Sequence, residues 1–122
     1  MTYLCLAYYD PDRSGSLSKE RFQEIVSQCP ECDRELKESG RLRSVASLVE
    51  NEVMTIRTRD GKRLITDGPY VESKEQVGSF FIVEAQDLND AVRIAQKHPA
   101  ARFGEELSWA VEVRPIARME AG

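Results

Sequence analysis

The segment Tyr3-Leu-Cys-Leu-Ala-Tyr-Tyr9 constrains the fold of this chain more than any other feature, because apolar residues fill both of its alternate sets of positions. Successive side chains of a strand point to opposite faces of a sheet, so a strand formed here has two apolar faces to cover. Asp10-Pro11 and Ser14-Gly15-Ser16 then supply turn-forming residues that end it. We therefore expect a first strand that is covered on both sides.

A helix is predicted to follow, from Ser18 to about Gly40. Ser18 is a suitable N-cap, and glycine is a common C-terminal stop. Helical spacing of apolar residues continues through Phe22, Ile25, Val26, Cys29 and Leu36. Pro30 interrupts this pattern because proline lacks the backbone donor and clashes with the preceding turn. The helix is expected to kink near Cys29 or to restart there, with Cys29 as a new N-cap.

The remaining chain predicts four more strand segments, a second helix and a final strand. Asp60-Gly61 between the β-rich residues 53–59 and 62–66 is a strong hairpin signal. Asp87 is a suitable N-cap for the second helix, and Pro99 stops it. The other strands are expected over residues 43–50, 78–85 and 109–116. This order, β-α-β-β-α-β with an added hairpin strand, is a ferredoxin-like plan of the α+β class.

The composition limits the organisation and the compartment. With 122 residues, 41% hydrophobic and 31% charged, the chain has the size and make-up of a single globular domain spanning residues 1–122. The net charge of −4 argues against nucleic acid and membrane surfaces as partners. The longest apolar run is too short to span a bilayer, and no basic region precedes it as in a signal peptide. Three cysteines without an export signal favour a reducing, cytoplasmic location.

The segment Thr66-Asp-Gly-Pro-Tyr-Val-Glu-Ser-Lys-Glu-Gln-Val-Gly-Ser-Phe80 resembles the signature of the YCII-related family, and within it the DGPF-domain branch. Residues 87–95, 98–101 and 111–116 are similar to the rest of the family pattern in order and spacing. The resemblance implies a dimeric α+β barrel, in which the open sheet of one chain pairs with that of a second around a cleft. A homodimer is therefore the expected assembly.

The chain also departs from the family pattern. Tyr70 stands where the motif has phenylalanine, and Ser79 stands in place of a second glycine. Some family members are thought to use a His-Asp pair, and the corresponding positions here are Cys29 and His98. That dyad is therefore not carried over to this chain.

Asp67 and His98 are the candidate catalytic residues. The carboxylate of Asp67 would act as an acid, a base or a ligand anchor in the cleft, although Asp67-Gly68-Pro69-Tyr70 also suits a purely structural turn. His98 is the only histidine and the only side chain whose ordinary pKa suits proton transfer near neutrality. Its place at the end of the second helix, where the helix dipole favours the charged ring, equally fits a helix-end role.

Four further residues are candidates for substrate binding: Tyr9, Tyr70, Glu112 and Arg114. The two tyrosines would stack on an apolar ligand, or belong to the core. Glu112 and Arg114 share one face of the last strand, opposite Trp109, Val111 and Val113. Arg114 would hold a carboxylate or phosphate if that face lines the cleft, whereas an outer solvated face or a salt bridge is the alternative.

Two other clusters carry weaker signals. Cys29-Pro-Glu-Cys32 is a CxxC pair whose first thiol would be activated at the start of a restarted helix, but its position midway along a helix favours buried or incidental thiols. Arg57, Arg59, Lys62 and Arg63 gather on the hairpin, where a solvated edge explains them better than contact with nucleic acid. No cofactor and no metal site is predicted.

The sequence thus favours a small-molecule-binding protein of the dimeric α+β barrel type, and it leaves open whether the protein is an enzyme using acid–base chemistry. The alternative is a non-catalytic regulatory or partner-binding module, linked through its family to sigma-factor-dependent transcription. Fold-level analogy does not decide between these classes, because ferredoxin-like domains carry many unrelated functions.

Overall fold

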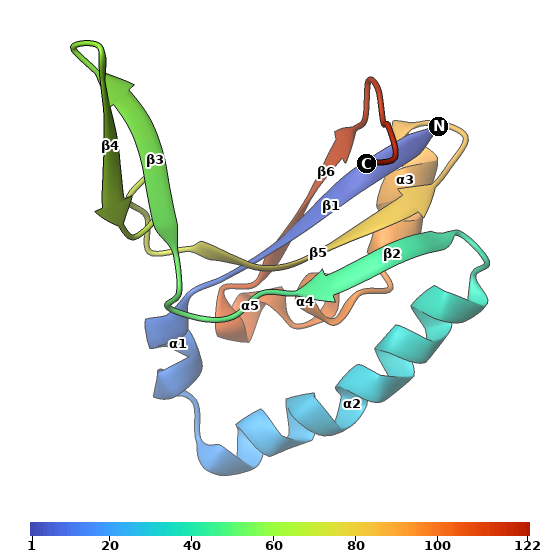
Figure 1. Ribbon diagram of the computed structural model, residues 1–122. Coiled ribbons are helices and arrows are strands. Elements are labelled where there is room, and N and C mark those ends of the chain that lie inside the picture. The colour runs from blue at the N-terminus through green and yellow to red at the C-terminus, as the bar shows by residue number, and fades with distance from the viewer.

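The computed structural model describes residues 1–122 apart from the side chain of Ser14, and it is a mixed α+β structure with antiparallel sheets (Figure 1). A four-stranded sheet has the order β2-β5-β1-β6, and β3 and β4 form a separate two-stranded sheet. The strands are β1 (Thr2–Tyr9), β2 (Leu42–Ser47), β3 (Met54–Arg59), β4 (Lys62–Asp67), β5 (Gln76–Glu84) and β6 (Ala110–Pro115). The helices are α1 (Pro11–Ser16), α2 (Lys19–Glu38), α3 (Leu88–Ala95), α4 (Pro99–Arg102) and α5 (Gly104–Leu107).

The core lies on one face of the four-stranded sheet, which we call the covered face. Tyr3, Cys5 and Ala7 of β1 are buried there, and α2 and α3 lie over them. The main cluster of buried residues contains Tyr3, Cys5, Leu36, Phe81, Val83, Ala85, Ala91, Ile94 and Ala95. A chain with this cluster has the apolar interior that its composition predicts.

The opposite face of the same sheet, the uncovered face, carries no helix in this chain (Figure 1). The register pairs Leu4 of β1 with Ile82 and Arg114, and Leu6 with Phe80 and Glu112, so these six side chains share that face. The four apolar ones are only partly buried. The prediction that β1 is covered on both sides is therefore met on one side within a single chain.

Helix α2 is continuous through Pro30, so the predicted restart with Cys29 as an N-cap is wrong. Ser18 is the N-cap, as predicted, and its hydroxyl accepts a hydrogen bond from the Arg21 backbone N–H at 3.1 Å. Pro30 is exposed, so the carbonyl group that loses its helical donor can bind water. Residues on both sides of Pro30 are buried, Ile25 before it and Leu36 after it, so both halves of the helix are held by packing.

Three short helices were not predicted. Asp10 and Pro11 form the start of α1, where the Asp10 carboxylate accepts hydrogen bonds from two backbone N–H groups, rather than a simple turn. Pro99 follows the second predicted helix and at the same time begins α4, with His98 as its N-cap. α5 follows at once. In each case the segment is one or two turns long, too short to show apolar periodicity in the sequence.

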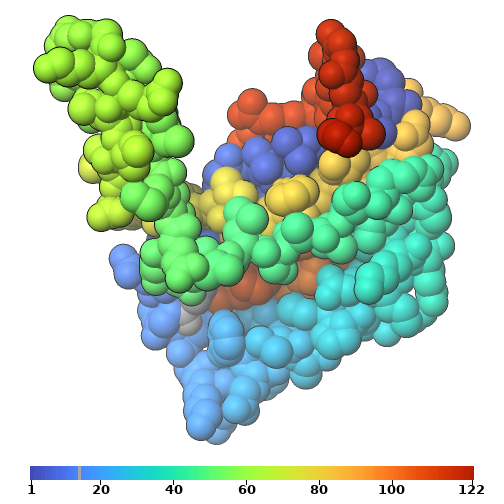
Figure 2. Space-filling model, in the orientation of Figure 1, coloured from blue at the N-terminus to red at the C-terminus, as the bar shows by residue number. Residues whose placement is uncertain are grey.

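The predicted hairpin is present, and its two strands form a sheet separate from the four-stranded one. Asp60 and Gly61 have φ angles of 53° and 75°, the left-handed values that a two-residue hairpin turn needs. β3 and β4 pair only with each other, and they project from the rest of the molecule (Figure 2). The strand that precedes the hairpin is shorter than predicted, since β2 ends at Ser47 rather than at residue 50.

No helix of the described chain has the length and apolar character needed to cross a membrane.

Candidate functional site

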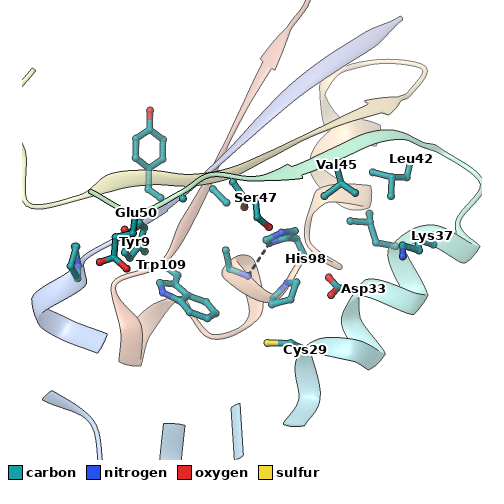
Figure 3. Close-up of a pocket in the computed structure, with 18 of the residues that line it drawn as sticks. Tyr9, Cys29, Asp33, Lys37, Leu42, Val45, Ser47, Glu50, His98 and Trp109 are labelled. Atoms are coloured by element: carbon teal, nitrogen blue, oxygen red, sulfur yellow. Dashed lines mark hydrogen bonds between the residues drawn. The ribbon is translucent and has the colours of Figure 1, made fainter. Parts of the chain in front are cut away.

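A cavity of about 700 Å³ lies on the covered side of the sheet, between α2, β2, α4 and the ends of β1 and β6 (Figure 3). Its middle is lined by Asp33, Ser47 and His98, and one end by Leu42, Val45 and Lys37. Tyr9, Glu50 and Trp109 line the other end. The volume falls in the range of small-molecule sites, which place a few polar groups among apolar walls.

His98 is held rigidly by its role in starting α4. Its Nδ1 atom accepts a hydrogen bond from the Ala100 backbone N–H at 3.0 Å. The ring also stacks on Phe81, with ring centroids 4.7 Å apart and planes 7° from parallel. Because an N–H group already points at Nδ1, the neutral ring carries its own proton on Nε2.

The surroundings of His98 favour this neutral form. Burial lowers the pKa of His98 from its usual value, and the nearby Asp33 carboxylate offsets only part of that shift. Protonation would also place an N–H on Nδ1, where it would face the Ala100 N–H instead of accepting from it. His98 follows the end of α3, where its backbone N–H donates to the Ala95 carbonyl at 3.0 Å, and it is at the same time the N-cap of α4. Because burial lowers its pKa, the expectation that a helix end favours its charged form is wrong.

Three side chains from successive turns of α2 reach the cavity: Cys29, Asp33 and Lys37. In Figure 3 the Asp33 carboxylate lies on the same side of the cavity as the His98 ring, close enough for its charge to act on that ring. Cys29 donates its S–H to the Ile25 carbonyl at 3.4 Å. Burial, then the charges of Cys32 and Asp33, raise the pKa of Cys29, so its thiol is not activated as a helix N-terminus would activate it.

At the end of the cavity lined by Tyr9, Glu50 and Trp109, two glycines allow close packing of the chain. Tyr9 lies against Gly78, where a Cβ atom would come within 2.9 Å of the Tyr9 ring. Gly104 faces the Trp109 backbone, where a Cβ atom would come within 2.4 Å of the carbonyl oxygen. Burial, followed by the charge of Glu50 and a hydrogen bond with it, raises the pKa of Tyr9.

Trp109 contributes an unused donor at this end. Its indole Nε1–H is buried and has no hydrogen-bond partner among the described residues. A buried N–H without an acceptor is costly, so an acceptor placed here would be favoured. The cavity therefore offers an imidazole and a carboxylate at its centre. At the end near Tyr9 it offers a hydrogen-bond donor, the Trp109 N–H, and an acceptor, the Glu50 carboxylate.

The structure does not bring the six predicted site residues together. Tyr9 and His98 line the large cavity. Asp67 lines a separate cavity of about 480 Å³ at the base of the hairpin, and Tyr70 is 72% exposed. Glu112 and Arg114 are on the uncovered face, where they form an ion pair with each other.

Sequence reasoning missed Asp33 and Glu50. The signal for Asp33 was present, because Cys29, Asp33 and Lys37 recur every fourth residue and so share one face of a helix. Glu50 follows β2 in a loop and reaches the cavity only through tertiary structure, so no spacing announces it. Among the described residues, no group of three or more His, Cys, Asp or Glu side chains gathers as a set of metal ligands.

Comparison with known proteins identifies relatives of the whole chain. The family model of the YCII-related domain matches residues 1–120. An uncharacterised protein of Rhizobium meliloti (strain 1021) is 30% identical over 123 residues, an alignment that covers 100% of this chain and 97% of that protein.

Two solved structures are similar at a lower level. One is the 5-chloro-2-hydroxyhydroquinone dehydrochlorinase TftG from Burkholderia phenoliruptrix AC1100, in complex with 2,5-dihydroxybenzoquinone. It has 16% identity and a TM-score of 0.49, with 100% of this chain and 96% of that chain covered. The other is the de novo designed protein Ferredog-Diesel, with 12% identity, a TM-score of 0.41, and coverage of 94% and 85%.

Proposed function

We propose that this chain, which belongs to the YCII-related family, is an enzyme that binds a small molecule in the large cavity and moves a proton on it. One observation carries the proposal: a buried histidine, whose Nδ1 accepts from the Ala100 N–H, lies near the Asp33 carboxylate inside a cavity of about 700 Å³. An N–H donor and a carboxylate in one cavity are groups that general acid–base catalysis can use.

The tautomer of His98 assigns the roles. Its Nδ1 atom is occupied by the Ala100 N–H, so only Nε2–H is available to a ligand, as a donor. A neutral N–H donor polarises a carbonyl or phenol oxygen in the ligand without adding a full charge to the site. Asp33 is then the base that takes the proton from the ligand.

Asp67 and the four substrate-binding candidates take different places in this proposal. Tyr9 is the one that contacts the ligand in the large cavity. Asp67 would act only on a ligand that reaches the base of the hairpin. Glu112 and Arg114, with Tyr70, would contact a ligand only if a second subunit closes a site over them.

We further propose a single ferredoxin-like domain of the DGPF branch that pairs into a homodimeric α+β barrel. The strand order β2-β5-β1-β6, with helices on one face, supports the ferredoxin-like topology. The DGPF-like turn supports the branch, since Gly68 has a φ of 94° that suits glycine. The partly exposed Leu4, Leu6, Phe80 and Ile82 support dimerisation through the uncovered face. The three free cysteines support a cytoplasmic location.

The test needs no knowledge of the full reaction. Wild-type protein is incubated in D2O with a panel of small carbonyl compounds and phenols, and proton NMR follows the exchange of acidic C–H groups for deuterium. We expect at least one compound to exchange faster with the protein, and Asp33→Asn to slow that exchange by about 10² to 10⁴-fold.

Glu38→Gln is the matched control, because Glu38 is on the same helix and its carboxylate is engaged outside the cavity by Arg34. Exchange that Asp33→Asn leaves unchanged would contradict the assignment of the base. Compounds that bind in the cavity without any accelerated exchange would favour the non-catalytic binding module instead.

A further inference from the structure

The β3–β4 hairpin, residues 54–67, has two chemically different faces. We call this segment the arm. Residues directly opposite each other in an antiparallel pair share a face, and the register pairs Ile56 with Ile65 and Met54 with Asp67. Ile56, Ile65 and Met54 therefore form an apolar strip on one face, which also carries the Thr58–Arg63 pair nearer the turn. The other face carries Arg57 with Leu64, and Arg59 with Lys62.

The apolar strip is strongly exposed in the single chain. Met54, Ile56 and Ile65 are 66%, 68% and 63% exposed. An isolated two-stranded hairpin is marginal in water and needs packing against another element to be stable. The arm is built of well-paired strands and yet packs on nothing in its own chain along this strip. A partner surface is therefore missing from the single chain.

The arm stands beside the uncovered face of the sheet. In Figure 1 it rises on the side opposite to α2, and Figure 2 shows it standing clear of the rest of this face. That face has its own partly exposed apolar residues, Leu4, Leu6, Phe80 and Ile82. A body that packs on the uncovered face therefore lies next to the arm, whose apolar strip is exposed.

The distribution of charge points to the nature of that body. The arm holds four cations, Arg57, Arg59, Lys62 and Arg63, against the two carboxylates Asp60 and Asp67, a net charge of +2. Since the whole chain has a net charge of −4, the rest of it carries −6. The rest of a second copy of this chain is therefore acidic overall, and opposite net charges favour its encounter with the basic arm.

We infer that the arm packs its Met54–Ile56–Ile65 strip on a second copy of this chain and extends the contact made by the uncovered face. Under two-fold symmetry each arm contacts the other subunit in the same way. This inference rests on the homodimer proposed above, and it assigns the hairpin as a part of the interface that the sheet alone does not supply.

The test compares two variants that add the same carboxylate to opposite faces of the arm. Ile56→Asp places it in the apolar strip, and Leu64→Asp, the matched control, places it on the basic face. Analytical ultracentrifugation over a dilution series gives the dimer dissociation constant of each. We expect Ile56→Asp to raise that constant by about 10- to 100-fold, and Leu64→Asp to change it by less than about threefold.

The outcomes separate the two proposals. A wild-type protein that is monomeric at all concentrations overturns the homodimer and this inference with it. A wild-type dimer whose dissociation constant is unchanged by Ile56→Asp overturns the arm contact and leaves the homodimer standing. Equal weakening by both variants overturns the assignment of the apolar strip as the contacting face.

A second measurement guards against a variant that merely unfolds the arm. A mixed dimer of isotope-labelled and unlabelled wild-type chains is examined by filtered NMR for contacts between subunits. We expect contacts from the methyl groups of Ile56 and Ile65 to the other chain. Their absence in a sample that is otherwise dimeric overturns the inference.

Discussion

The two faces of the four-stranded sheet carry similar apolar side chains but differ in how far those side chains are buried. On the covered face, Tyr3 and Cys5 are 2% and 0% exposed beneath α2 and α3. On the uncovered face, Leu4 and Leu6 alternate with them along the same strand and remain only partly buried. One face builds the interior of the chain and positions the cavity, whereas the other has an apolar surface that the chain itself does not bury. Equal hydrophobicity along a strand therefore does not mean equal burial within one chain.

The neighbouring residues Phe80 and Phe81 sharpen this comparison most, since they point to opposite faces of β5. Phe81 is fully buried and stacks on His98. We expect Phe81→Ala to lower the free energy of unfolding by about 3–5 kcal/mol. Phe80→Ala should cost only about 1 kcal/mol when the protein is dilute enough to be monomeric. Urea unfolding of both variants measures this, and equal losses would contradict the difference between the faces.

The protonation of His98 gives a smaller, pH-dependent effect that belongs to the covered face alone. Its pKa is lowered in the folded protein by burial, so the unfolded chain binds the proton more readily. The stabilising contribution is therefore complete above the ordinary histidine pKa of about 6.5 and is lost as the pH falls below it.

His98→Asn is the suitable comparison because asparagine is also a good N-cap for α4. We expect the wild type to lose more stability than His98→Asn as the pH falls from about 7.5 to 5.5, measured by urea unfolding at each pH. Parallel curves for the two proteins would show that burial does not hold His98 neutral.

The smallest effect is expected at the polar end of the uncovered face. Glu112 and Arg114 form an ion pair whose side chains are 41% and 64% exposed. Such exposed pairs contribute about 0–1 kcal/mol. We expect Arg114→Ala to change the unfolding free energy of the dilute protein by no more than this. A loss of several kcal/mol would mean that this face is buried in the single chain.

The sequence predicts those features of the structure that depend on neighbouring residues better than those that depend on contacts between distant segments. Ser18, Asp60-Gly61 and Asp87 mark local events, and the structure has the helix caps and the hairpin turn at these positions. The predicted restart of the helix at Pro30 is wrong. The free-energy cost of a proline inside a helix is local, and it is outweighed by the burial of Ile25 and Leu36 on either side.

The cavity could be predicted only in part. Tyr9 and His98 were identified by residue type, and both line it. To find Asp33, the α2 face had to be considered together with His98, which lies 65 residues further along the chain. Glu50 reaches the cavity from a loop, where sequence spacing carries no information about position. Contacts between distant segments therefore set the limit of the prediction.

His98 is proposed to be a neutral donor whose ring is held by the Ala100 N–H, and its tautomer can be measured directly. Long-range nitrogen–proton NMR correlation of uniformly labelled wild-type protein at pH 7 reports the protonation of both ring nitrogens. We expect Nδ1 to carry no proton and Nε2 to carry one. A proton on Nδ1, alone or together with one on Nε2, would contradict this expectation and would remove the proposed division of roles between His98 and Asp33.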